Sequence, residues 1–271
     1  MTDIAIGPTG DLAFYLKRLR LPRVGEQLAN TLQQASQEGW SYEEFLTTLL
    51  EVEIFARDQA TTERRMRAAR FPHRSKTLET FDFTFQTSVK KQVMLHLASL
   101  RFIELHYNVI FLGPPGVGKT HLSLALGLRA VQAGYDVLFL SAVEMVTHLL
   151  EAEERGTLKQ AFKRLLKPDL LIVDEIGYIP FARQAANLFF QIVSARYETG
   201  SMILNSNRPF SGWGEIFGGD VVVAAAMIDR LVHYAEIVTL AGSSYRLKGK
   251  EMLTKSVADG PAHIVDGATG P

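Results

Sequence analysis

The 271-residue sequence contains no cysteine. This absence excludes a disulfide scaffold, a zinc–thiolate site and a cysteine nucleophile. An excess of charge of one sign is also lacking, because 29 Lys and Arg residues balance 29 Asp and Glu residues, so the net charge indicates neither a nucleic-acid nor a membrane partner. No apolar run approaches the length of a membrane span, the longest lying near Val221 to Ile228, and no export signal opens the chain. We therefore expect a cytoplasmic protein.

The sequence does contain two regions of different character. Apolar side chains at helical spacing between residues 11 and 70 predict a small all-helical N-terminal domain, to which we give the bounds 1–80. In residues 81–250, apolar strands alternate with amphipathic helices, which predicts an α/β fold with a parallel five-stranded sheet covered on both faces. Residues 251–271 carry glycine and proline with little periodicity and predict a flexible tail.

The positions of the elements follow from the same patterns. In the N-terminal domain, Ser41 and Glu44 form a capping-box pair that opens a helix running toward Ala69. The predicted strands are 109–112, 137–140, 170–173, 202–204 and 237–240. The predicted helices of the second domain lie near 90–102, 119–133, 143–153, 183–198 and 222–233.

A glycine-rich segment stands between the first predicted strand and the helix that follows it. Its glycines allow successive N–H groups to point at an anion, and the start of the helix adds partial positive charge. The lysine of such a segment reaches the outer phosphates, and the hydroxyl after it binds Mg²⁺. The sequence therefore predicts a phosphate-binding loop made of Gly113, Pro114, Pro115, Gly116, Val117, Gly118, Lys119 and Thr120.

The strand 170–173 ends in two acids, Asp174 and Glu175. Alone, such an ending is usually a solvated loop, but ligands of parallel sheets gather at the carboxyl ends of the strands. Beside a phosphate loop, Asp174 suits a place at Mg²⁺ and Glu175 suits the base that orients and deprotonates an attacking water. The pair favours hydrolysis over transfer to a small molecule.

Two further positions are candidates for the same site. Asn205 and Asn207 follow the predicted strand 202–204, and a side-chain amide there would hold the attacking water. Alternation sends both to one side, so spacing does not separate them; we favour Asn207, although either residue would also cap a turn. Arg230 lies on the predicted helix 222–233. A lone arginine on a helix most often forms a surface salt bridge, here with a neighbour such as Asp229.

Together these motifs resemble the AAA+ ATPases of the DnaC and DnaA branch over about residues 81–250. The chain is still more similar to IstB-type proteins, the helper ATPases of insertion-sequence transposition, and the helical segment with its arginine cluster extends that likeness over nearly the whole chain. The phrases that carry it are Val173-Asp174-Glu175-Ile176-Gly177-Tyr178, Ser206-Asn207-Arg208-Pro209-Phe210, the isolated Trp213 and Ser244-Tyr245-Arg246-Leu247-Lys248.

The resemblance implies ATP and Mg²⁺ as cofactors and ATP hydrolysis as the activity. It implies that Arg230 is an arginine finger acting in trans on a neighbouring subunit, and that Arg246 is the sensor-two arginine that contacts nucleotide. It also implies an ATP-dependent homo-oligomer on double-stranded DNA, with a transposase as partner.

Residues 57–76 hold seven bases against two acids. On an ideal helix, four of these arginines fall within an arc of about 140 degrees, an arrangement that would contact successive DNA phosphates. The alternative is a solvated face paired with the acidic block 26–53. The DNA-binding candidates are Arg57, Arg64, Arg67 and Arg70 in the arc, with Arg65 to one side and Arg74 beyond it.

Three other functions are compatible with the same residues. A DnaC-like loader of a replicative helicase would share every ATPase residue, a small-molecule kinase would use the phosphate loop for transfer, and a nucleotide-dependent scaffold would have negligible turnover. Trp213, in a glycine-rich loop, is either an interface anchor or loop packing.

Overall fold

The computed structural model describes residues 11–247, so the predicted tail 251–271 and Lys248 lie outside the described residues. The chain divides between Arg65 and Met66 into two compact units, a helical unit (from 11) and an α/β unit (to 247). The α/β pattern of the sequence starts near residue 80, whereas the compact unit starts earlier. The reason is that the segment after residue 65 packs on the core of the α/β unit through Met66, Ala69, Phe71 and Leu78.

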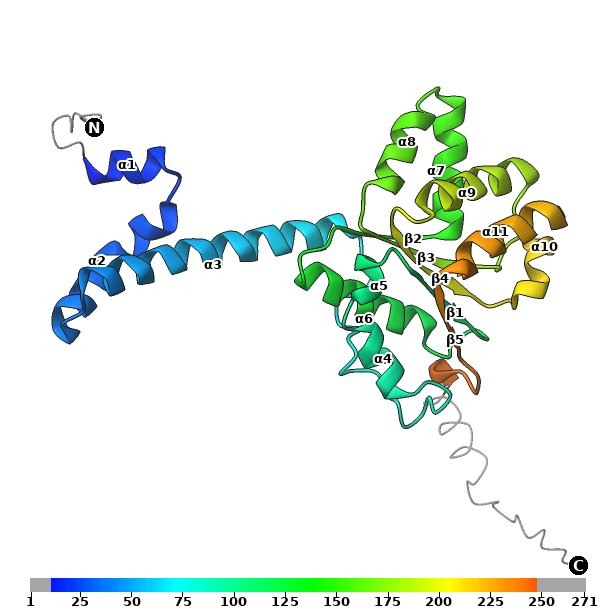
Figure 1. The fold of residues 1–271 in the computed structure, drawn as a ribbon, viewed down its shortest axis with the longest axis horizontal. Helices are drawn as coiled ribbons and strands as arrows, with labels where there is room; N and C mark the ends of the chain where they lie inside the picture. The colour runs from blue at the N-terminus through cyan, green and yellow to red at the C-terminus, as the bar shows by residue number, and fades with distance from the viewer. Residues whose placement is uncertain (1–10, 248–271) are drawn as a thin grey trace, which may run out of the picture. The chain divides into compact units, whose positions relative to one another are not determined.

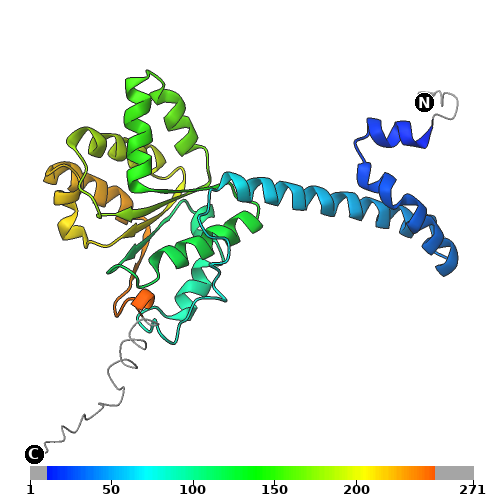
Figure 2. The ribbon, with the colours of Figure 1, turned by 180° about the vertical axis from the view of Figure 1, so that it is seen from behind.

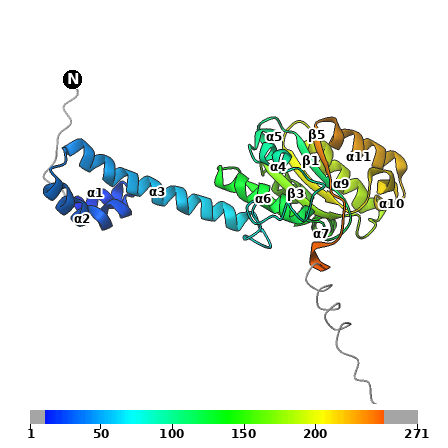
Figure 3. The same cartoon turned by 90° about the horizontal axis from the view of Figure 1, so that it is seen from below.

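The helical unit contains α1 (Leu12–Arg18), α2 (Pro22–Glu38) and α3 (Tyr42–Ala68), and α3 continues past the division (Figures 1 and 3). The predicted capping box opens α3, since the Ser41 N–H donates to Glu44 Oε2 at 2.7 Å and the Glu44 N–H donates to Ser41 Oγ at 3.2 Å. The helix ends at Ala68, and Arg70 takes a left-handed conformation with φ of +58°. Arg70 therefore does not continue the helical arc predicted for it.

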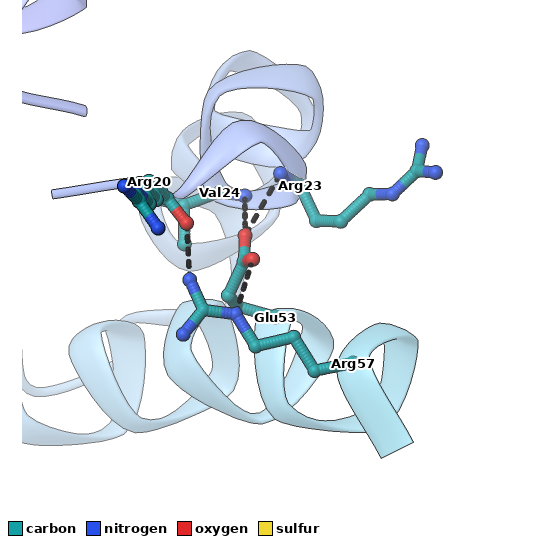
Figure 4. A network of polar contacts seen from close by, with 5 residues as sticks. All are labelled: Arg20, Arg23, Val24, Glu53 and Arg57. Carbon is teal, nitrogen blue, oxygen red and sulfur yellow. Dashed lines mark hydrogen bonds and ion pairs between the residues drawn. The ribbon is translucent and has the colours of Figure 1, made fainter. Parts of the chain in front are cut away.

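Glu53 joins α3 to the start of α2, which has no side-chain cap of its own. Its Oε2 accepts hydrogen bonds from the N–H groups of Arg23 at 2.9 Å and Val24 at 3.4 Å. Arg57 donates to Glu53 Oε1 at 2.9 Å and to the Arg20 carbonyl (Figure 4). Burial opposes the charge on Glu53, but the hydrogen bonds from Arg57 and from the two N–H groups outweigh it and lower its pKa. Glu53 thus acts as a cap supplied by the neighbouring helix.

The α/β unit is built on a five-stranded parallel sheet, as the sequence predicts. The strand order in the sheet is β2-β3-β4-β1-β5. Its last strand begins two residues earlier than expected. The strands are β1 (Asn108–Leu112), β2 (Val137–Ser141), β3 (Leu170–Ile176), β4 (Ser201–Ser206) and β5 (Ala235–Thr239).

Helices cover both faces of the sheet (Figures 1 and 2). One face carries α4 (Lys91–Leu97), α5 (Arg101–Glu104) and α6 (Lys119–Gln132), and the other carries α7 (Ala142–Glu154), α8 (Leu158–Leu166), α9 (Arg183–Arg196), α10 (Trp213–Ile216) and α11 (Val221–His233). Short 3₁₀ turns lie at Phe210–Gly212 and Tyr245–Leu247.

The sheet has an apolar core on each face, which explains why its strands are continuous runs of apolar residues in the sequence. Leu171 and Val173 of β3 belong to the core under α7, α9 and α11, whereas Leu170 and Ile172 belong to the core under α4, α5 and α6. The sequence predicts one helix over 90–102, but two are present because Leu100 takes a left-handed conformation with φ of +64°. In the described part of the chain, every helix is too short or too polar to cross a membrane.

Candidate active site

The glycine-rich segment forms a tight loop between β1 and α6. Gly113, Gly116 and Gly118 have φ of +152°, +80° and +106°, values that residues with a side chain rarely adopt. Close neighbours add a second constraint: a Cβ on Gly118 would lie 2.6 Å from a ring carbon of Phe81, and one on Gly113 would meet the Leu240 carbonyl. The loop therefore needs glycine for its backbone and for its contacts.

The Lys119 ammonium lies inside this loop. The residue is 7% exposed, and Nζ donates to the carbonyls of Gly113 at 2.6 Å and Pro114 at 2.8 Å. Burial lowers the pKa of Lys119, Asp174 opposes that shift, and Arg246 adds to it. A buried ammonium within a glycine-rich loop at a helix start is an arrangement that binds phosphate.

A cavity of about 250 Å³ opens beside the loop. The loop contributes Gly116 to Thr120, and β3 contributes Asp174 and Glu175. Residues far apart in the sequence complete the wall: Lys76, Thr80, Phe81, Asp82, Phe85, Gln86, His121, Tyr178, Tyr245 and Arg246. The fold thus brings Gly116 to Thr120 of the predicted phosphate loop, both acids and Arg246 to one cavity. The rest of the predicted loop, Gly113 to Pro115, does not line it.

Asp174 is 6% exposed and is held by a buried chain of hydrogen bonds. Ser123 Oγ donates to Asn205 Oδ1 at 2.7 Å, and Asn205 Nδ2 donates to Asp174 Oδ1 at 2.9 Å. The N–H of Glu175 also donates to Asp174 Oδ1 at 2.9 Å. Within residues 11–247, Oδ2 of Asp174 makes no hydrogen bond, so one carboxylate oxygen is fixed and the other is left for a ligand.

Glu175 follows in a left-handed conformation, with φ of +64°. A non-glycine residue in this region carries backbone strain, and such strain is concentrated at functional sites. The side chain is exposed and lines the cavity. Burial and the neighbouring Glu175 both raise the pKa of Tyr178, a further wall residue.

The two asparagines at the end of β4 lie in different environments. Asn205 is fully buried, and its amide is occupied by Ser123 and Asp174. Asn207 is half-buried one residue after β4, its N–H donates to the Ile176 carbonyl at 3.3 Å, and a Cβ on Gly177 would lie 2.7 Å from its Oδ1. That Oδ1 is buried and has no hydrogen-bond partner within residues 11–247. Neither amide lines the cavity.

The two candidate arginines differ in their relation to the cavity. Arg246 is exposed in its wall, and the adjoining Tyr245 N–H donates to the Gly116 carbonyl at 3.0 Å, so the segment is tied to the phosphate loop. Arg230 of α11 does not line the cavity; its guanidinium lies 4.8 Å from the ring centroid of Phe190. Within the described ranges Arg230 forms no salt bridge, unlike the pairing with Asp229 that its sequence position favours.

The wall formed by residues 76–86 is not part of the sequence prediction. Phe81 packs edge-on against His121, with ring centroids 5.2 Å apart, and Phe85 packs edge-on against Tyr245 at 5.2 Å. Gln86 Nε2 donates to the Val117 carbonyl at 3.0 Å. The alternating aromatics Phe81-Asp82-Phe83-Thr84-Phe85 are the sequence signal that points to this wall.

The six DNA-binding candidates do not share one environment. Arg57 is bonded to Glu53 and Arg20, while Arg64 and Arg67 are exposed on α3. Arg70 lies beyond the helix and lines a second cavity of about 350 Å³, whose wall also includes Arg155 and Arg164. The remaining candidates are Arg65, half-buried on α3, and Arg74, exposed in the following segment.

Trp213 is part of the hydrophobic core of the α/β unit. The side chain is fully buried in the core, where it contacts the rings of Phe210 and Phe217. Its Nε1 donates to the Arg208 carbonyl at 3.4 Å. Of the two roles considered for Trp213, interface anchor or loop packing, the structure favours packing.

The family of IstB-like ATP binding proteins matches residues 14–252 of this sequence. The chain belongs to this family. Among similar proteins, an insertion sequence IS21 putative ATP-binding protein of Pseudomonas aeruginosa is 44% identical over 91% of this chain and 93% of its own length. An insertion sequence IS5376 putative ATP-binding protein of Geobacillus stearothermophilus is 40% identical over 90% of this chain and 97% of its own length. The predicted resemblance to IstB-type proteins is confirmed.

Solved structures share the fold of this IstB-like protein over part of the chain. A replication initiator DnaA bound to AMPPCP and single-stranded DNA covers 68% of this chain and 56% of its own, at 24% identity and a TM-score of 0.54. The DnaC helicase loader covers 61% of this chain and 96% of its own, at 19% identity and a TM-score of 0.51. The predicted AAA+ fold is therefore confirmed.

Proposed function

We propose that this IstB-like protein hydrolyses ATP as a helper of transposition, assembling with further copies of itself on duplex DNA and recruiting or activating a transposase. The observation that carries the proposal is the convergence of Lys119, Thr120, Asp174 and Glu175 on one cavity. The family description, which names ATP binding, and the insertion-sequence names of the relatives support it.

The chemistry of the wall fits ATP and Mg²⁺. Lys119 and the N–H groups of the loop would bind the outer phosphates. The Thr120 hydroxyl and the free Oδ2 of Asp174 are oxygen ligands of the kind that Mg²⁺ prefers. Mg²⁺ held by these two oxygens would neutralise the charge that develops on the phosphate during cleavage.

Glu175 would act as the general base. Its carboxylate takes a proton from a water whose oxygen attacks the terminal phosphorus, and the bond from phosphorus to the leaving ADP oxygen breaks. Asn207, beside the turn at Gly177, would hold this water. Asn205 has a different role, because its amide is already used to orient Asp174.

Arg230 would complete the site of a neighbouring copy. Its absence from the wall of its own cavity and its half-buried place over Phe190 support action in trans. An arginine delivered to the transferring phosphoryl group raises turnover by about 10³ to 10⁵. ATP held between two copies would also stabilise their association, because it binds the assembled state more tightly.

Duplex DNA would contact the exposed arginines Arg64, Arg67 and Arg70, with Arg65 and Arg74 nearby in sequence. Phosphate contacts of this kind tolerate any sequence and depend strongly on salt. Arg57 contributes less to this surface, since its guanidinium already bonds Glu53 and Arg20.

A Glu175→Gln variant tests the proposal. It keeps the shape of the side chain and removes the base, so ATP and DNA binding should persist, phosphate release should fall by at least about 10², and the oligomers on DNA should outlast those of the unchanged protein. Disassembly and phosphate release at the unchanged rates would contradict the proposal.

The same preparation separates the rival functions. Phosphate release stimulated by duplex DNA supports a transposition helper, whereas stimulation by single strands alone supports a DnaC-like helicase loader. Turnover that needs neither DNA nor assembly but requires a small-molecule acceptor supports a kinase, and ATP-dependent assembly without turnover supports a scaffold.

A further inference from the structure

Lys76 is a second lysine in the wall of the cavity, and it comes from the segment before the phosphate loop. The residue is half-buried. No hydrogen bond or short ion pair joins its side chain to another of residues 11–247. A lysine that lines a cavity without a bonded partner has its ammonium available to a ligand.

The backbone around Lys76 is fixed on the first turn of α6. Thr80 Oγ1 accepts from the Thr77 N–H at 3.0 Å and lies 3.1 Å from the Ser75 carbonyl, to which it donates. The Thr77 carbonyl accepts from His121 Nε2 at 2.8 Å, and His121 follows the phosphate loop directly. Burial lowers the pKa of His121, which favours the neutral ring in this contact. The segment carrying Lys76 is thereby tied to the loop that carries Lys119.

Lys76 and Lys119 also share their electrostatic surroundings. Burial lowers the pKa of both lysines, Arg246 lowers both further, and Asp174 opposes the shift in each. Both lysines line the cavity together with Asp174 and Arg246, and each ammonium is within electrostatic range of that carboxylate and that guanidinium. The acids of β3, beside which the outer phosphates would be cleaved, line the same cavity.

The remaining charges of the wall leave a place for a polyanion. Besides Asp174 and Glu175, its third acid is Asp82, whose Oδ1 accepts from Thr84 and from the Phe85 N–H. Among residues 11–247, Lys76, Lys119 and Arg246 form no salt bridge with Asp82.

We propose that Lys76 binds the terminal phosphate of ATP, as a third cation beside Lys119 and Arg246. The proposal rests on the proposed function, because it requires ATP in this cavity. Since Lys76 lies on the segment that leads out of α3, the contact would also make that segment sensitive to whether ATP or ADP is bound.

The test measures binding of fluorescent ATP and ADP analogues to the full-length chain with Mg²⁺, without DNA. Lys76→Met removes the charge and keeps the length of the side chain; Lys76→Arg restores a cation. Lys159→Met is the matched control, because Lys159 is an exposed lysine of the α/β unit outside the cavity. Lys119→Ala serves as the reference for loss of the phosphate loop itself.

Lys76→Met should weaken ATP binding at least about tenfold, the effect of losing one charge-assisted hydrogen bond, and should change ADP binding less than about threefold. Lys76→Arg should recover most of the ATP affinity, and Lys159→Met should change neither. Equal losses for ATP and ADP, or no loss of either, would overturn the role of Lys76 while leaving the proposed function intact. Failure of the unchanged protein to bind ATP would overturn both.

Discussion

Replacing Asn205 with alanine tests how the fold holds Asp174. The change removes the 2.9 Å hydrogen bond to Asp174 Oδ1 and the 2.7 Å bond from Ser123, which keeps a second bond to the Lys119 carbonyl at 3.1 Å. A buried hydrogen bond to a charged group contributes about 1.5 to 3 kcal/mol and a neutral one about 0.5 to 1.5 kcal/mol. We expect Asn205→Ala to lower the free energy of unfolding by about 2 to 4 kcal/mol.

The assay is urea denaturation of the full-length chain without nucleotide, followed by titration of ATP with and without Mg²⁺. Because Asp174 would be misplaced, ATP affinity should fall in Mg²⁺ and change little without it. Ser194→Ala is the control: its hydroxyl is buried without a hydrogen bond to any of residues 11–247, so its loss should not lower the free energy of unfolding. An Asn205→Ala variant as stable as the unchanged chain, with the same dependence on Mg²⁺, would refute the reasoning.

Three further changes test the loop, the arginines and the helical unit. Gly118→Ala should weaken ATP binding at least about tenfold, because the added methyl group would clash with Phe81 and the residue has a positive φ. Gly156→Ala is the control and should not weaken it, since Gly156 also has a positive φ but no atom lies within 4 Å of the added Cβ. Calorimetric titration of ATP measures both variants. Removing Arg64, Arg67 and Arg70 together should reduce the slope of log K for duplex DNA against log salt by about 2 to 3, and the same count of charges removed at Lys159, Lys163 and Lys167 should leave it unchanged. Glu53→Ala should speed amide hydrogen exchange at Arg23 and Val24, measured by mass spectrometry, while the exposed Glu51→Ala should not.

Features set by short stretches of sequence could be predicted. The phosphate loop, the capping box at Ser41 and the five strands depend on neighbours within a few residues. The capping box is at its predicted place, and each strand begins within two residues of its predicted start, although β3 runs three residues further than predicted. Asp174 at the end of β3 follows from the same local logic, since parallel strands bring their carboxyl ends to one edge.

Features that depend on residues far apart in the sequence could not be predicted. The pairing of Ser123 with Asn205 joins residues 82 positions apart, so spacing at the end of β4 leaves the two asparagines equivalent. In the sequence, Arg57 is one of several similar basic residues. Only the structure shows that its guanidinium donates hydrogen bonds to Glu53 and to the Arg20 carbonyl. Left-handed residues at Leu100 and Arg70 interrupt helical periodicity without glycine to signal the break.

The most direct test of the central claim is a mixing experiment with two inactive variants. Glu175→Gln lacks the base but keeps Arg230, and Arg230→Ala lacks the arginine but keeps the base. If Arg230 acts on the nucleotide of a neighbouring copy, each variant alone should release phosphate slowly on duplex DNA, and their mixture should recover a substantial part of the activity. A mixture no more active than its separate components, or full turnover by Arg230→Ala alone, would contradict catalysis shared between copies.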